Sequence, residues 1–125
     1  MLTKGNELVS SVIYHINDLS MHDSTALSEL ISDKRVLIFM GPAPFSRLDT
    51  EQASEYETLS SDILSQGIDQ IMGIYVQDAF VMKKFQEQVQ SSVNSKNIKF
   101  YGDGDAFLVK ANNIMEDFTF QGLSV

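Results

Sequence analysis

The 125-residue chain contains no cysteine and no tryptophan, and it has only two histidines and two prolines. Without cysteine it can form neither disulfides nor thiolate metal sites, and it cannot use a thiol as a nucleophile. No apolar run reaches the roughly 20 residues that a membrane-spanning helix needs. Lys4 is followed by polar residues and not by an apolar segment, so no signal peptide is visible and we expect a cytoplasmic protein.

Basic side chains are also scarce, with 9 against 17 acidic ones and a net charge of −8. A negative net charge argues against binding to nucleic acids or to anionic membranes. The two signs are interleaved along the chain, which indicates solubility and not a binding patch. The hydrophobic content of 43% and the length predict a single domain with a substantial core.

Strands and helices are predicted to alternate. Runs of β-branched and aromatic residues predict strands over residues 12–16, 35–40, 68–76 and 98–101. The strand over 35–40 has no polar alternation, which is typical of a central parallel strand buried on both faces. Residues 17–24 have turn chemistry, and a short helix over 26–31 would be capped by Ser24 or Thr25. The alternation predicts an α/β fold with a mostly parallel sheet.

Two longer helices are predicted between these strands. The first would start at Asp49 or Thr50 and end at Gly67, a left-handed cap residue. Its apolar face has helical spacing and comprises Ala53, Tyr56, Leu59 and Ile63. Asp78 is predicted to cap the second helix. At the C-terminus we favour a short helix over 105–111 followed by a loop, and the alternative is a closing hairpin over 107–120.

The candidate site is the loop that joins strand 35–40 to the long helix, where Ser46, Arg47 and Asp49 lie. In α/β proteins, ligands gather where the carboxyl end of a strand meets a helix N-terminus. Asp49 could instead be a helix cap, because Gln52 follows at the capping-box distance. Arg47 could pair with Asp49 or with Glu51, or bind an anion.

A family resemblance runs through this loop. Residues 36–49, VLIFMGPAPFSRLD, resemble the strand and active-site loop of the type-five, atypical two-cysteine peroxiredoxins. Pro42 lies in the matching loop, Phe45 and Ser46 match a Phe and a Thr of the family pattern, and Arg47 replaces a Pro. Asp49 stands at the position of the peroxidatic Cys. Four further segments also resemble that family: 4–8 (KGNEL), 27–30 (LSEL), 76–85 (VQDAFVMKKF) and 117–125 (DFTFQGLSV).

The resemblance implies a thioredoxin-like α/β fold of the peroxiredoxin type, a homodimer, and a reaction that needs no metal or organic cofactor. The family reduces peroxides with a thiolate. The carboxylate of Asp49 is far too weak a nucleophile for that reaction, so we expect no peroxidase activity. The resemblance also implies that two strands and a helix of the family fold are missing after Val125. We therefore expect a truncated domain with an open edge at strand 35–40.

Two functional hypotheses follow. The first is a non-catalytic peroxiredoxin-like module that binds a protein partner or a second copy of itself. The second is an enzyme of different chemistry that uses Asp49 and Ser46 as acid–base or anion-binding groups. No metal site is expected, because His15 and His22 lack further ligands at metal spacing and the GDGD sequence at 102–105 lacks the remaining ligands of a calcium loop.

Overall fold

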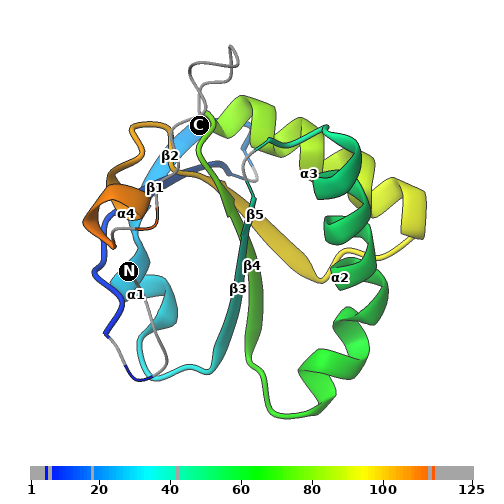
Figure 1. The fold of residues 1–125 in the computed structure, drawn as a ribbon. Coiled ribbons are helices and arrows are strands. Elements are labelled where there is room, and N and C mark those ends of the chain that lie inside the picture. Colours follow the sequence, from blue (N-terminus) through cyan, green and yellow to red (C-terminus); the bar gives the residue numbers. More distant parts are fainter. Residues whose placement is uncertain (1–4, 6, 18, 42, 113, 115–125) are drawn as a thin grey trace.

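One mixed sheet of five strands forms the centre of the molecule (Figure 1). The structure is a computed structural model and describes residues 5, 7–17, 19–41, 43–112 and 114. The elements in chain order are β1 (Val12–Ile16), β2 (His22–Ala26), α1 (Leu27–Ile31), β3 (Val36–Gly41), α2 (Arg47–Ser65), β4 (Gln70–Tyr75), α3 (Ala79–Val93), β5 (Ile98–Gly102) and α4 (Phe107–Ala111). The strand order is β2-β1-β5-β4-β3. Strands β3, β4 and β5 are parallel, and β1 is antiparallel to both β2 and β5.

Helices cover both faces of this sheet, so the molecule has two hydrophobic clusters. Figure 1 shows α2 and α3 on one face and α1 and α4 on the other. The first cluster, under α2 and α3, includes Phe39, Ile71, Tyr75, Met82, Phe85, Val89 and Phe100. The second cluster, under α1 and α4, includes Ile13, Leu27, Met72, Ile74, Tyr101 and Leu108. Strand β4 supplies side chains to both clusters, as expected for a parallel strand buried on both faces.

Strand β3 is the edge of the sheet within the described part of the chain, where it pairs only with β4. This agrees with the open edge expected at strand 35–40, whereas the central position that its apolar run suggested is wrong for the described residues. The prediction rested on its unbroken apolar run, yet only Phe39 is fully buried along the strand. Both faces of β3 are partly covered by helices, which explains the apolar sequence without a second neighbouring strand.

The sequence did not reveal β2. Residues 22–24, predicted as a turn, pair with β1 in a register that runs from Val12–Ala26 to Ile16–His22. They are polar and exposed because β2 is the other edge strand, so they lack the apolar pattern by which strands are predicted. Ala26, and not Ser24 or Thr25, precedes α1 and provides no side-chain cap.

The C-terminal helix is confirmed over the described residues as α4. Asp103, which is buried, accepts the N–H groups of Leu108 and Val109 at 3.1 Å each and so holds the start of this helix. The hairpin alternative depends mostly on residues 113 and 115–125, which lie outside the described residues. None of the described helices is long and apolar enough to cross a membrane.

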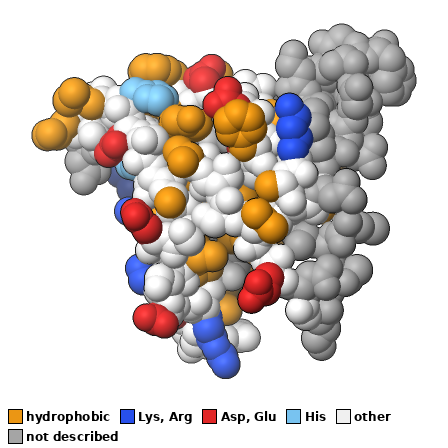
Figure 2. Space-filling model, turned by 90° about the vertical axis from the view of Figure 1, so that its left-hand side faces the viewer, with side chains coloured by type: hydrophobic (Ala, Val, Ile, Leu, Met, Phe, Trp, Pro, Cys, Tyr) orange, Lys and Arg blue, Asp and Glu red, His pale blue; other side chains and the backbone are white. Residues whose placement is uncertain are grey.

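Charges of both signs are dispersed over the face shown in Figure 2, the left-hand side of Figure 1. Hydrophobic side chains lie between them, and neither sign forms a continuous patch on this face. This distribution agrees with the interleaved charges of the sequence.

Candidate functional site

The candidate site lies at the end of β3, where residues 43–46 lead into α2. Helix α2 begins at Arg47, two residues before the predicted start at Asp49. Ser46 is its N-cap: the backbone is extended there, and its Oγ accepts the N–H of Asp49 at 3.3 Å. Asp49 is therefore not the N-cap, and the predicted capping box with Gln52 is wrong. Both Ser and Asp are capping residue types, and spacing alone did not distinguish them.

The carboxylate of Asp49 points back into the loop. Its Oδ2 accepts the N–H of Ala43 at 2.7 Å, and the residue is only 6% exposed. Its Oδ1 lies over Gly41, where an added Cβ would be 2.5 Å from this oxygen. The side chain thus neither caps its own helix nor faces open solvent. It joins the start of α2 to the end of β3.

Tyr75, at the end of β4, pairs with Gly41 and lies beside the Asp49 carboxylate. A Cβ on Gly41 would come within 2.7 Å of the Tyr75 ring, so glycine allows the carboxylate and the phenol to meet over the strand end. Burial and, next, the charge of Asp49 raise the pKa of the Tyr75 phenol far above its ordinary value. The phenol is therefore protonated at neutral pH. Its buried hydroxyl has no hydrogen-bond partner among the described residues.

Phe45 has an unusual backbone conformation at this site. Its φ of 71° lies in the left-handed region, which costs a non-glycine residue about 1–2 kcal/mol. Its ring packs edge-to-face on Phe85 with centroids 5.3 Å apart, while 46% of the residue is exposed. This aromatic contact holds the loop in its strained form. Pro42, the remaining predicted loop residue, lies outside the described residues.

Arg47 forms an ion pair with Glu51 at 3.1 Å, as one of the predicted alternatives had it. The two side chains are 88% and 56% exposed, so the pair contributes only about 0.3–0.5 kcal/mol. The guanidinium bonds Glu51 and not Asp49. The loop therefore brings Ser46, Asp49, Gly41 and Tyr75 together, whereas Arg47 belongs to the helix surface.

Known proteins resemble this chain in sequence and in fold. A peroxiredoxin of Rhizobium etli is 34% identical over 89 residues, which cover 70% of this chain and 47% of that protein. The crystal structure of reduced Prx3 from Vibrio vulnificus in complex with H2O2 aligns with a TM-score of 0.84 and 28% identity, over 94% of this chain and 72% of that one. The chain resembles peroxiredoxins in sequence and in fold.

The chain has the thioredoxin-like α/β fold that was predicted, with a five-stranded sheet between helices. Peroxiredoxin 5 from Alvinella pompejana shares this fold at a TM-score of 0.77 and 18% identity, over 90% of this chain and 70% of that one. The chain spans about half the length of the Rhizobium etli protein. No protein-family model matches it.

Sequence reasoning missed a buried carboxylate outside this loop. Glu57 on α2 is 0% exposed. Its carboxylate accepts hydrogen bonds from five groups: Asn97 N–H at 2.6 Å, Ser95 Oγ–H at 2.7 Å, Ile98 N–H at 3.2 Å, Gln90 Nε2 at 3.4 Å and Ser60 Oγ–H at 3.5 Å. Leu59, predicted on the apolar face, is instead 52% exposed. The available signal was the helical spacing of Glu57 and Ser60 from Ala53, which places all three on one buried stripe.

The two histidines make aromatic contacts. His15 lies edge-on to Tyr101 with ring centroids 5.4 Å apart, and His22 stacks on Tyr14 at 5.4 Å. Within the part of the chain that the structure describes, no three His, Cys, Asp or Glu side chains are grouped as metal ligands.

Proposed function

We propose that this chain is a non-catalytic module of the type-five peroxiredoxin branch, with Asp49 at the position of the peroxidatic Cys. Its role would be to bind a protein partner or a second copy of itself. The supporting observation is the carboxylate of Asp49, which is 6% exposed and accepts the Ala43 N–H. A carboxylate held in this way is not offered to a substrate. It also cannot pass through a sulfenic acid, as a thiolate does.

The alternative is an enzyme that uses Asp49 and Ser46 for acid–base chemistry. The buried hydroxyl of Tyr75, which lacks a partner among the described residues, favours this alternative. Three observations count against it. Ser46 Oγ accepts a helix N–H, Asp49 accepts a loop N–H, and the pKa of Tyr75 is raised away from neutral pH. General acids and bases work best when their pKa lies near the operating pH.

A peroxidase assay tests the proposal that the chain is not catalytic. With hydrogen peroxide or an alkyl hydroperoxide and a thiol reductant, the chain is expected to give only the background rate, because it has no cysteine. The Asp49→Cys variant is expected to stay close to background as well, because residue 49 is 6% exposed. A cysteine-containing peroxiredoxin assayed in parallel is the positive control. Turnover well above background in the unmodified chain would contradict the proposal, and fast turnover by Asp49→Cys would contradict the closed site.

Strand β3 provides the surface for self-association. Within the described sheet it pairs on one side only, and residues 36–40 contain neither a charge nor a proline. Charged side chains and proline are the usual protection of an edge strand against pairing with another chain. Two copies related by a twofold axis could pair β3 with β3, because the same edge is self-complementary.

Sedimentation velocity over low micromolar concentrations tests this association. We expect a dimer that dissociates on dilution, and Val36→Lys is expected to shift it towards monomer by placing a charge on the edge strand. Val12→Lys makes the same change on β1, at a residue that is 42% exposed, and is the control for the added charge. Val36 is half-buried and packs against the second cluster, so both variants are first checked for folding by circular dichroism. A chain that is monomeric throughout the concentration series would exclude this interface.

A further inference from the structure

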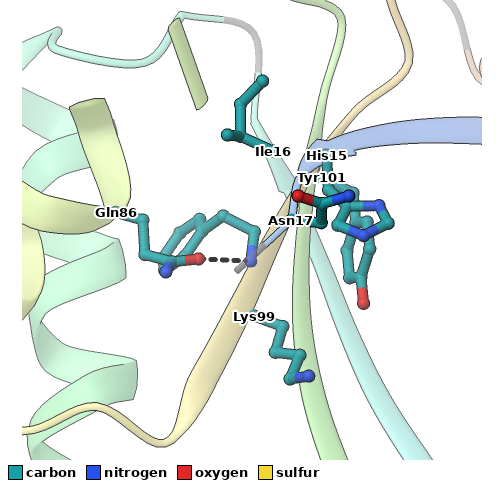
Figure 3. Close-up of a pocket in the computed structure, with 7 residues that line it drawn as sticks. His15, Ile16, Asn17, Gln86, Lys99 and Tyr101 are labelled. Carbon is teal, nitrogen blue, oxygen red and sulfur yellow. Dashed lines mark hydrogen bonds between the residues drawn. The ribbon is translucent and has the colours of Figure 1, made fainter. Parts of the chain in front are cut away.

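We propose that the pocket between β1 and β5 binds a small oxyanion, namely a phosphate or carboxylate group carried by a small molecule (Figure 3). Its volume is about 200 Å³. Pockets for drug-sized ligands are larger, at roughly 300–1,000 Å³. The site is therefore suited to a single small group. It lies apart from Asp49 and is independent of the proposed function.

The pocket exists because two antiparallel strands separate. Strands β1 and β5 pair only at Tyr14 and Gly102. Continuing that register would place His15 opposite Tyr101 and Asn17 opposite Lys99. These four side chains line the pocket instead, together with Gln86 from α3. The space that further strand pairing would occupy is open to a ligand.

Side chains of helices form hydrogen bonds with the backbone groups of β5 that would otherwise pair with β1. Phe100 N–H donates to Gln86 Oε1 at 3.0 Å, the bond that Figure 3 marks with a dashed line. Ile98 N–H donates to Glu57 Oε2 at 3.2 Å, and the Ile98 carbonyl accepts from Gln90 Nε2 at 2.8 Å. A peptide strand could not add to an edge whose groups are already bonded. Recognition in this pocket must therefore come from side chains.

Lys99 and His15 each carry a group that remains for a ligand. Lys99 forms no ion pair with any described carboxylate, and Nδ1 of His15 is buried without a described hydrogen-bond partner. Tyr101 holds the His15 ring edge-on at 5.4 Å. In Figure 3, Lys99 extends on the other side of β5 from Gln86, on the side where His15 and Tyr101 lie.

The electrostatic setting favours an anion. Among the described residues, none of the acidic side chains lines the pocket. An ammonium group and an imidazole N–H bind oxyanions through charge-assisted hydrogen bonds, which are stronger than those between neutral groups. An oxyanion is therefore the ligand class that satisfies both Lys99 and His15.

Amide NMR shifts of the full chain test the proposal, with inorganic phosphate in one titration and acetate in another, at constant ionic strength held by chloride. We expect saturable shifts confined to residues 15–17 and 98–101, and the tighter of the two ligands identifies the head group. Lys99→Gln is expected to weaken binding about fivefold or more. Lys96→Gln, at an exposed position three residues earlier, is the matched control and should change affinity by less than about twofold.

His15→Phe provides a second variant. It keeps an aromatic ring against Tyr101 and removes Nδ1, so it is expected to weaken binding while the spectrum of the free protein stays folded. Shifts that fail to saturate with either anion, or that spread over the surface, would overturn the proposal. Equal weakening by Lys96→Gln and Lys99→Gln would also overturn it, because that result means non-specific screening.

Discussion

Replacing Glu57 by Gln is expected to lower the free energy of unfolding by about 2–3 kcal/mol. The carboxylate is fully buried and only accepts hydrogen bonds, and two of its donors are the backbone N–H groups of Asn97 and Ile98. An amide of the same shape has one acceptor oxygen and one NH2 group. Whichever way it is turned, its NH2 faces one of these N–H groups. A buried donor is then left without an acceptor, which costs about 1–3 kcal/mol each time.

Urea unfolding followed by circular dichroism measures this effect. Glu55→Gln is the matched control, because Glu55 is exposed on the same helix and should stay within about 0.5 kcal/mol of the unmodified chain. Equal midpoints for Glu57→Gln and the unmodified chain would mean that the carboxylate does not join α2 to the segment before β5.

Gly41→Ala is expected to destabilise the protein by about 2–3 kcal/mol. The new Cβ would lie 2.5 Å from Asp49 Oδ1 and 2.7 Å from the ring of Tyr75. Both side chains are buried, so neither can move without losing its present contacts. The same unfolding measurement applies.

Gly104→Ala is the control for this substitution. A Cβ there would be 3.6 Å from the nearest atom, an ordinary contact, and the position is exposed. It is expected to be neutral or slightly stabilising, because alanine restricts the unfolded chain. Equal effects at both positions would show that the end of β3 has room for a side chain, contrary to the described site.

Most of the fold could be predicted from local patterns. Strands β1, β3, β4 and β5 and helices α2 and α3 follow from β-branched runs and helical periodicity. Two local signals were also confirmed: Asp78 accepts the Val81 N–H at 2.9 Å as the cap of α3, and Gly67 has a φ of +94° after α2. Such signals act within a few residues, so the sequence contains them directly.

Features that depend on distant partners could not be predicted in this way. Strand β2 is polar and depends on its pairing with β1. From the sequence alone, Glu57 would be expected on the exposed face of a helix. It is a buried hydrogen-bond acceptor because of its contacts with residues 90–98. The position of β3 at the sheet edge is likewise set by which strands are present, and not by its own apolar sequence.

The candidate site shows the same limit. The junction of β3 and α2 was predictable, and so was the closeness of Ser46 and Asp49. The direction of the Asp49 carboxylate was not, because it depends on the Ala43 N–H and on space left by Gly41 beside Tyr75. Ser46, and not Asp49, is the N-cap of α2, and it follows Phe45, whose backbone is left-handed.

The central claim is that Asp49 has a structural role and not a catalytic one. A double-mutant cycle measured by urea unfolding tests this claim most directly, with Asp49→Ala, Gly41→Ala and both changes together. Asp49→Ala alone is expected to lose about 1–2 kcal/mol, because the Ala43 N–H loses its acceptor. Removing the carboxylate should also lower the cost of Gly41→Ala by about 1 kcal/mol, since one of its two close contacts is gone. Strictly additive effects, or a gain in stability on Asp49→Ala of the kind seen when a carboxylate is kept for function, would contradict the account.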